Sequence, residues 1–201
     1  MTLPAGLTVA SGLNAMAHRV EAFWAPRRNP VSSAVAEDGI RRLAGGLPAV
    51  AADATDPAAS ADLLLGAHLA GSAFAVAGSG PHHEICHVLG GAFDLPHART
   101  HAVVLPHVLA HNAPPPPRPS PGSRGHSARP TPRRRCTPWA GGLGLPAGLR
   151  ELGPAEEDVD TVLDPILAVV PADNPRPVPR EGLRGLLRRA WSGEAPRKET
   201  A

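Results

Sequence analysis

Apolar residues recur every three or four positions along most of the chain, the spacing of helices that bury one face. The first such stretch follows Ser11, whose hydroxyl suits the N-cap position, and Pro26 and Pro30 end it. Its apolar positions are Leu13, Met16, Ala17, Val20, Phe23 and Trp24. We therefore predict a helix beginning at Ser11, after a short loop over residues 1–10.

A second helix is predicted from Ser32 or Ser33 to Leu43, where Gly45-Gly46-Leu47-Pro48 supplies helix-breaking residues. The later segments repeat the pattern, although Gly66 and Gly71 in the Ala/Leu-rich one suggest close helix packing. Further helices are expected at residues 58–77, 82–90, 98–111, 156–170 with a kink or restart at Pro165, and 179–191.

No period-2 alternation indicates a strand, so the predicted fold class is all-α. Residues 114–138 break the pattern, because nine of these 25 residues are Pro, six are Arg and none is acidic. Such a composition predicts an unpacked linker with polyproline character. We therefore expect a helical core over residues 1–113, this linker, and C-terminal helices of the same domain over residues 139–201.

Charge and cysteine content exclude several classes of protein. The chain has 201 residues and a formal net charge of +2, which argues against a protein that coats nucleic acid. Arg133–Arg135 form a local basic run, but no aromatic residues are interleaved for base stacking, so we interpret it as solvated. Two cysteines exclude a disulfide scaffold, and Cys86 lies in an apolar run typical of a reduced core residue.

No run approaches 18 uninterrupted apolar residues, and the first residues lack the layout of a secretion signal. The sequence thus predicts a soluble, cytoplasmic protein with neither membrane nor nucleic acid as a partner.

Histidine is the main chemical signal, because seven of the ten His lie between residues 82 and 111. His83 and His87 are four residues apart and share a helix face, as do Asn14 and His18 on their own helix, and His97 begins a helix. Imidazole is the commonest metal ligand, so this layout suits a metal site assembled from several helices. The alternative is that several of these residues are ordinary surface or core histidines.

His83-Glu84-Ile85-Cys86-His87 fits H-E-x-x-H, the zinc metallohydrolase pattern in which Glu is the general base. Three fixed positions match easily by chance in a His-rich chain. Gly90 fits the longer metzincin form, but Phe93 stands where that form needs a third His. A metallohydrolase using Glu84 and a non-catalytic helical module both stay open as alternatives.

A longer match covers most of residues 6–113. The runs GLTVASGLNAMAHRVEAFWAPRRNPVSSAVAEDGIRRLAGGLPAV and HHEICHVLGGAFDLPHARTHAVVLPHVLAHNAP resemble the maleylacetate reductase branch of the iron-containing alcohol dehydrogenase family. ELGPAEEDVD and NPRPVPREGLRGLLRRAWSGEAP resemble the C-terminal end of that family. The resemblance implies a dehydroquinate-synthase-like architecture, of which this chain has the helical metal-binding half and not the N-terminal α/β nucleotide-binding half.

The resemblance also implies a site. His18, His83 and His97 match three metal-binding His, and Asn14 stands where the family has an Asp, so the ligand set for Fe²⁺ or Zn²⁺ is Asn14, His18, His83 and His97. Replacing a carboxylate by an amide should weaken a divalent site. His87 matches a His near the reacting centre and is the candidate for proton delivery. His101 is the candidate for binding substrate carboxylates, with Arg99 as a further cationic candidate.

The implied reaction is the NAD(P)H-dependent reduction of maleylacetate to 3-oxoadipate in the degradation of aromatic compounds; another activity of the same family is the alternative. Ala77-Gly78-Ser79-Gly80 is short and lies between predicted helices, so no nucleotide-binding turn is assigned. We therefore expect the chain alone to be inactive or to bind the nicotinamide cofactor weakly. The expected partners are a small dicarboxylate and either a second copy or a separately encoded nucleotide-binding domain.

Overall fold

The computed structural model describes residues 3–112 and 143–197, and these residues contain helices and no strand. This agrees with the all-α prediction. In chain order the elements are α1 (Ala5–Glu21), α2 (Pro30–Ala52), α3 (Pro57–Ala77), α4 (Pro81–Phe93), α5 (His97–Asn112), the 3₁₀ helix η1 (Leu149–Leu152), α7 (Asp158–Thr161), α8 (Leu163–Val169) and α9 (Arg180–Ser192). The predicted linker and Arg133–Arg135 lie outside the described residues.

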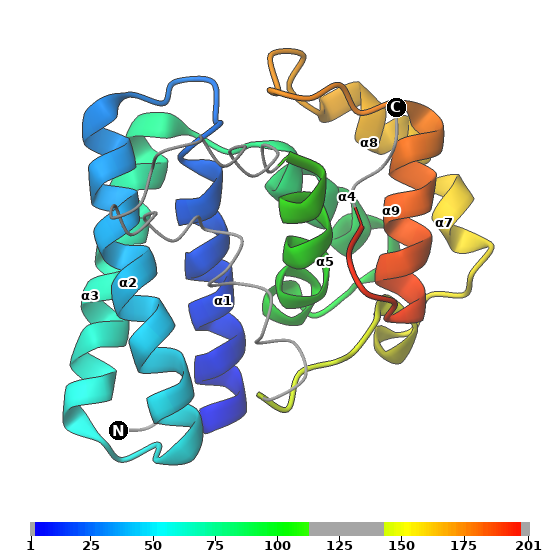
Figure 1. Cartoon of the computed structure of the whole chain (residues 1–201). Coiled ribbons are helices and arrows are strands. Elements are labelled where there is room, and N and C mark those ends of the chain that lie inside the picture. The colour runs from blue at the N-terminus through cyan, green and yellow to red at the C-terminus, as the bar shows by residue number, and fades with distance from the viewer. Residues whose placement is uncertain (1–2, 113–142, 198–201) are drawn as a thin grey trace, which may run out of the picture.

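The three long helices α1, α2 and α3 stand side by side (Figure 1). Small residues let their backbones approach closely, since a Cβ on Gly66 would lie 2.8 Å from the Leu43 side chain and one on Gly46 would lie 2.9 Å from Leu63. Close packing at Gly66 was expected, whereas a Cβ on Gly71 would meet nothing within 4 Å.

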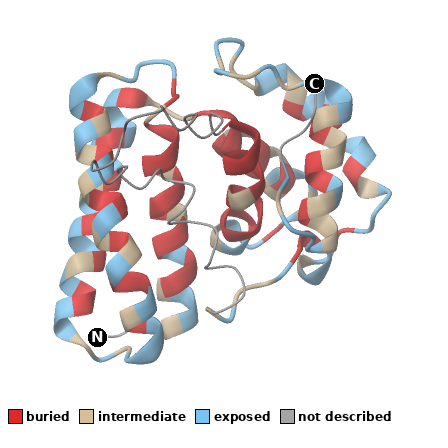
Figure 2. Ribbon diagram, in the orientation of Figure 1, coloured by how far each residue is buried: buried red, intermediate tan, exposed pale blue. Residues whose placement is uncertain are grey.

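Helix α5 lies between these helices and the C-terminal ones, and it is buried along almost its whole length (Figure 2). Ala102, Leu105 and Leu109 join the apolar cluster of α1–α3. Val104 and Val108 join a second cluster with α4, α7, α8 and α9. The same helix therefore connects both apolar clusters and fixes where its own N-terminal residues stand relative to α1.

Several predicted boundaries of the first two helices are wrong. The first helix begins at Ala5 rather than at Ser11, because Val9 and Ala10 are buried in the core and keep the preceding turns helical. The second continues through Gly45-Gly46-Leu47-Pro48 to Ala52. Burial of Leu47 and Val50 offsets the usual cost of an internal proline, which is about 3 kcal/mol.

The start of α2 also differs from the prediction. Asn29 is the N-cap and accepts from the backbone N–H groups of Val31 and Ser32, while the Ser32 hydroxyl accepts from the Asn29 N–H. This is a capping box.

The remaining helices lie close to their predicted ranges. The predicted 156–170 segment restarts at Leu163, with Pro165 in the first turn of α8, where its missing N–H is tolerated. Cys86 is buried and has no disulfide, as expected of a core residue.

Helix α3 is long and apolar enough to pass a length-and-composition test for a membrane span. Core helices of soluble proteins and signal sequences pass the same test. In α3, 33% of the apolar stretch is buried, and Ala59, Leu63 and Ala70 belong to the cluster shared with α1, α2 and α5.

Candidate metal centre

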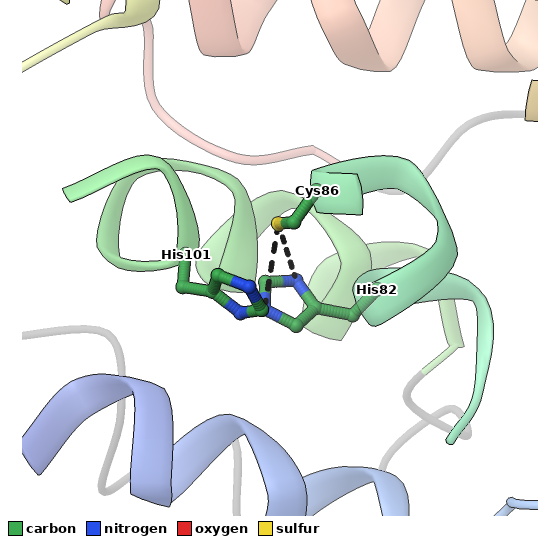
Figure 3. Close-up of side chains that lie close together, drawn as sticks. All are labelled: His82, Cys86 and His101. Atoms are coloured by element: carbon green, nitrogen blue, oxygen red, sulfur yellow. Dashed lines mark hydrogen bonds between the residues drawn. The ribbon is translucent and has the colours of Figure 1, made fainter. Parts of the chain in front are cut away.

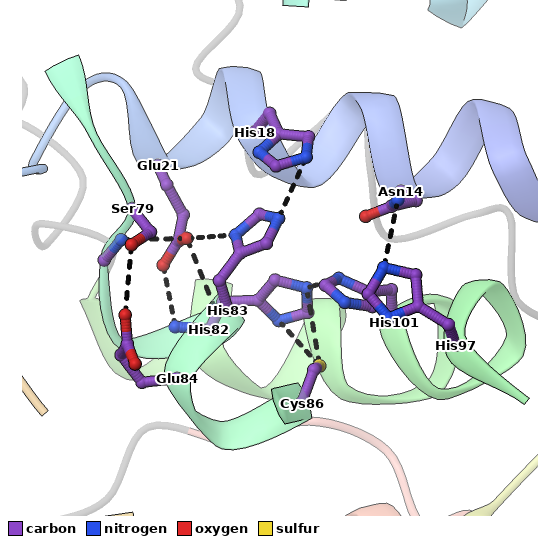
Figure 4. A network of polar contacts seen from close by, with 11 residues as sticks. Asn14, His18, Glu21, Ser79, His82, His83, Glu84, Cys86, His97 and His101 are labelled. Carbon is purple, nitrogen blue, oxygen red and sulfur yellow. Dashed lines mark hydrogen bonds and ion pairs between the residues drawn. The ribbon is translucent and has the colours of Figure 1, made fainter. Parts of the chain in front are cut away.

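Three helices bring the sequence-predicted residues together. The second half of α1 carries Asn14 and His18, the first turns of α4 carry His83 and His87, and the first turn and a half of α5 carries His97 and His101. Figure 4 shows Asn14, His18, His83, His97 and His101 converging from these helices on one region.

His18 and His83 face each other through the same ring atom. Their Nε2 atoms are 3.2 Å apart, and the rings are stacked with centroids 3.9 Å apart. Phe74 of α3 also packs against His18, with ring centroids 4.8 Å apart. The two imidazoles are therefore held with their Nε2 atoms close enough to bind the same metal ion.

Asn14 lies beside His97, with its Nδ2 3.5 Å from His97 Nε2. The Asn14 Oδ1 is buried and has no hydrogen-bond partner among the described residues. An orphaned buried acceptor in a native protein calls for an explanation such as an ion or water. Here the amide oxygen offers a neutral oxygen ligand next to the imidazoles.

His101 and His87 complete the cluster. The His101 ring lies 4.7 Å from that of His83 and 4.3 Å from that of His97, and its buried Nε2 has no partner among the described residues. His87 is exposed, 6.0 Å from the His83 ring and 6.2 Å from the His97 ring. His87 therefore stands at the solvent side of the cluster and His101 at its base.

Burial keeps most of these imidazoles neutral. It lowers the pKa of His18 to about 3 and that of His101 to about 2, with neighbouring imidazoles, His83 first, adding to the effect. Burial also lowers the pKa of His97 below its usual value. A neutral imidazole has a lone pair on one ring nitrogen, which is the form that binds metal ions.

Glu21, at the end of α1, is a residue that sequence reasoning missed. Its side chain is fully buried, and Oε2 lies 2.5 Å from His83 Nδ1. The carboxylate also accepts from the backbone N–H groups of Gly80, His82 and His83, at 3.0, 2.7 and 3.4 Å. The sequence signal was present, because Asn14, His18 and Glu21 share one helix face at i, i+4 and i+7.

His82 was also missed. Its Nε2 lies 3.0 Å from His101 Nδ1, and Cys86 Sγ lies 3.8 Å from His82 Nε2 and 3.9 Å from Nδ1 (Figure 3). These ligand atoms lie within 4.8 Å of one another, all on buried residues. However, the sulfur is equally far from both His82 nitrogens, which is how a thiol packs against a ring, and burial raises the pKa of the Cys86 thiol. The arrangement fits a hydrogen-bonded histidine pair better than a second metal site.

The H-E-x-x-H interpretation has little support from this geometry. The Glu84 carboxylate accepts a hydrogen bond of 3.0 Å from the Ser79 hydroxyl, and Figure 4 shows it on the far side of Glu21 from His18. In the H-E-x-x-H pattern the general base would have to reach a water bound to a metal ion held by His83 and His87.

Arg99, the further cationic candidate, is exposed.

Comparison with known proteins places this chain in a family. A sequence model described as "Fe-containing alcohol dehydrogenase family, C-terminal" matches residues 8–191. A maleylacetate reductase from Sphingobium indicum is 43% identical over 197 residues, covering 98% of this chain and 55% of that protein. A maleylacetate reductase from Delftia acidovorans is 40% identical over 194 residues, covering 96% and 55%. The chain thus spans about half the length of the curated relatives it matches.

Solved structures of members of the same family are also similar to this chain. The maleylacetate reductase from a Rhizobium species has a TM-score of 0.80 at 37% identity, covering 97% of this chain and 55% of that one. An iron-containing alcohol dehydrogenase from Corynebacterium glutamicum has a TM-score of 0.80 at 38% identity, covering 96% and 54%. The all-helical fold and the match over residues 8–191 lead to one conclusion: the chain belongs to the iron-containing alcohol dehydrogenase family, and it corresponds to the C-terminal helical part.

Proposed function

We propose that this chain supplies the metal- and substrate-binding part of a maleylacetate reductase. The observation that carries the proposal is the convergence of Asn14, His18, His83, His97 and His101 from three helices, in a chain about 40% identical to maleylacetate reductases. The reaction adds a hydride from NADH or NADPH to one carbon of the maleylacetate double bond and a proton to the other. This gives 3-oxoadipate and the oxidised nucleotide.

Asn14, His18, His83 and His97 would hold Fe²⁺ or Zn²⁺. Two nitrogens bound to one tetrahedral ion at about 2.1 Å lie about 3.4 Å apart. The separation of 3.2 Å between the Nε2 atoms of His18 and His83 fits this value. The unpartnered Asn14 Oδ1 fits a fourth ligand, although a neutral one. When bound, the ion supplies Lewis-acid polarisation of a substrate oxygen.

His87 and His101 have different roles in the proposal. His87 is exposed at the rim of the cluster, where it can exchange protons with solvent and deliver one to the substrate carbon. His101 is buried and neutral, so its unpartnered Nε2 binds the substrate through a hydrogen bond rather than through a positive charge. The exposed Arg99 is the cationic candidate for a substrate carboxylate.

The cofactor is a separate part of the proposal. Within residues 3–112 and 143–197 there is no strand–glycine turn–helix unit of the kind that binds a pyrophosphate. We therefore propose that the 201-residue chain alone binds NADH weakly and reduces maleylacetate only when a nucleotide-binding domain is supplied. We also propose that it acts in the cytoplasm, where reduced nicotinamide cofactors are available.

The test combines metal content with NADH oxidation in the presence of maleylacetate, with and without a supplied nucleotide-binding domain. His83→Ala and His97→Ala should each lose bound metal, whereas His68→Ala, which removes an exposed histidine on α3, should keep it. Unchanged metal content in both site variants would refute the ligand set. Micromolar affinity of the chain alone for NADH would refute the dependence on a second domain.

A further inference from the structure

The N-terminus of α4 has no cap of its own. Its N-cap residue is Gly80, which has no side chain, and Pro81 at the first helical position has no N–H. The first intrahelical bond is donated by the Glu84 N–H to Gly80 O at 3.4 Å. The backbone N–H groups of Gly80, His82 and His83 therefore need acceptors from elsewhere in the protein.

All three N–H groups are satisfied by one carboxylate. Glu21 reaches them from the end of α1, about sixty residues earlier in the chain. A Cβ at position 80 would lie 2.7 Å from Glu21 Oε1, so glycine at this position is what allows the carboxylate so close. The positive end of the α4 dipole stabilises the negative charge of Glu21. At the end of α1, by contrast, an acidic side chain is unfavourable, and this tertiary contact explains why it is tolerated.

The same carboxylate accepts from a side chain. Its Oε2 lies 2.5 Å from His83 Nδ1, and a carboxylate can only accept, so Nδ1 carries the proton. A neutral imidazole has one ring proton, which leaves the Nε2 of His83 with its lone pair, 3.2 Å from His18 Nε2. His18 has no such partner, because its Nδ1 is buried without a hydrogen bond. Of the two facing histidines, only His83 has its proton placed by a neighbouring carboxylate.

We propose that Glu21 is a positioning residue of the candidate metal centre: it confines the His83 proton to Nδ1, so that the Nε2 lone pair faces His18 and is ready to bind a divalent cation. Carboxylates that orient a metal-binding histidine in this way typically change metal affinity by 10–100-fold when mutated. The inference rests on the proposed metal site. It adds Glu21 as the residue that prepares one of the metal ligands, His83, to bind the ion.

Glu21→Gln is the discriminating variant. The amide keeps the length of the side chain but replaces one oxygen by an N–H₂ group, which would face a backbone donor or His83 Nδ1–H. In the metal-free 201-residue chain, ¹⁵N NMR of the histidine rings reports which nitrogen carries the proton, with the His83 signals assigned by their loss in His83→Gln. We expect wild-type His83 to have its proton on Nδ1 and Glu21→Gln to populate both tautomers. Titration with Zn²⁺ alone should give a dissociation constant 10–100-fold higher in Glu21→Gln.

Asp56→Ala is the matched control, because Asp56 caps α3 by accepting from the backbone N–H groups of Ala58 and Ala59 and lies on another helix end. It should lower Tm without changing the His83 tautomer or Zn²⁺ affinity. If Glu21→Gln behaves in the same way, Glu21 is only a helix cap and the inference is overturned.

Two outcomes separate this inference from the proposed function. If wild-type His83 carries its proton on Nε2, the inference fails whatever Glu21→Gln does. If the wild-type chain binds no Zn²⁺ while the tautomer still depends on Glu21, the metal site fails and the positioning role of Glu21 stands.

Discussion

In the proposed ligand set, Asn14 contributes a neutral amide oxygen beside three imidazoles. His18 and His97 supply nitrogens without charge, because burial lowers their pKa values. The proposed ligand set therefore contains no anion, and the nearest buried carboxylate, Glu21, contacts His83 Nδ1 rather than the ligand atoms. At the residue scale, we expect the missing negative charge at position 14 to limit the affinity of the proposed site for a divalent cation.

Asn14→Asp should therefore raise the affinity for Zn²⁺ at least about tenfold, which needs only about 1.4 kcal/mol of additional attraction between a carboxylate and the ion. Isothermal titration with Zn²⁺ measures it. Ser11→Asp adds the same charge at an exposed position one turn earlier on α1 and should leave affinity close to wild type. Equal affinities for Asn14→Asp and wild type would show that residue 14 is not a ligand.

At the scale of the elements, hydrogen bonds from one buried arginine connect α1 to α2 and α3. Arg19 of α1 is fully buried and donates to the backbone carbonyls of Gly66 on α3 and of Val35 and Ala36 on α2. The guanidinium occupies the space over Gly39, where a Cβ would lie 1.5 Å from Arg19 Cζ. Because Arg19 follows His18 directly, this packing also fixes how α1 presents His18 to the site.

Gly39→Ala should destabilise the protein by about 3 kcal/mol, because the methyl group displaces a buried, hydrogen-bonded charge. Gly45→Ala is the control on the same helix, since its Cβ would meet nothing within 4 Å. It should be neutral or stabilise by up to about 1 kcal/mol through helix propensity. Urea unfolding of both variants measures the difference, and equal free energies of unfolding would contradict the packing argument.

At the scale of the whole molecule, α5 carries buried histidines with different surroundings, among them one at the candidate metal centre and one near α9. His101 faces the site, whereas His107 is buried on the same helix, with Nδ1 unpartnered and Arg189 of α9 near enough to affect its charge. Burial first, and then Arg189, lowers the pKa of His107 to about 4. Such groups make the fold sensitive to acid, because the unfolded chain binds protons that the folded protein does not.

The direction in which stability changes with pH follows from proton binding by His107. The His107 pKa is about 4 in the folded protein and has its ordinary value of 6.5 in the unfolded chain, so this residue costs stability as pH falls from 6.5 towards 4. His107→Leu should remove that loss, which amounts to about 2 kcal/mol between pH 7 and pH 5. Urea unfolding of variant and wild type at both pH values measures it. Parallel losses of stability in the two proteins would contradict the assignment.

Much of this protein could be predicted from its sequence. The helical spacing determined that the chain is all-α, and the positions of Asn14, His18, His83, His87, His97 and His101 selected the residues that the structure brings together. Helix boundaries were less predictable. The first turns of α1 and the passage of α2 through Pro48 depend on burial of Val9, Leu47 and Val50, and no local signal contains that contribution.

Only the tertiary structure decided which groups act on which histidine. Glu21 and His83 are 62 residues apart in sequence, and they meet because α1 ends where α4 begins. His82 directly precedes the H-E-x-x-H motif and Cys86 lies within it, but in the folded protein His82 pairs with His101 and the Cys86 thiol packs against the His82 ring. The sequence by itself determined which ligand-type side chains are available. Packing of α1 against α4 and α5 decided their protonation, their pairing and the positioning carboxylate, because those depend on desolvation and on contacts between distant segments.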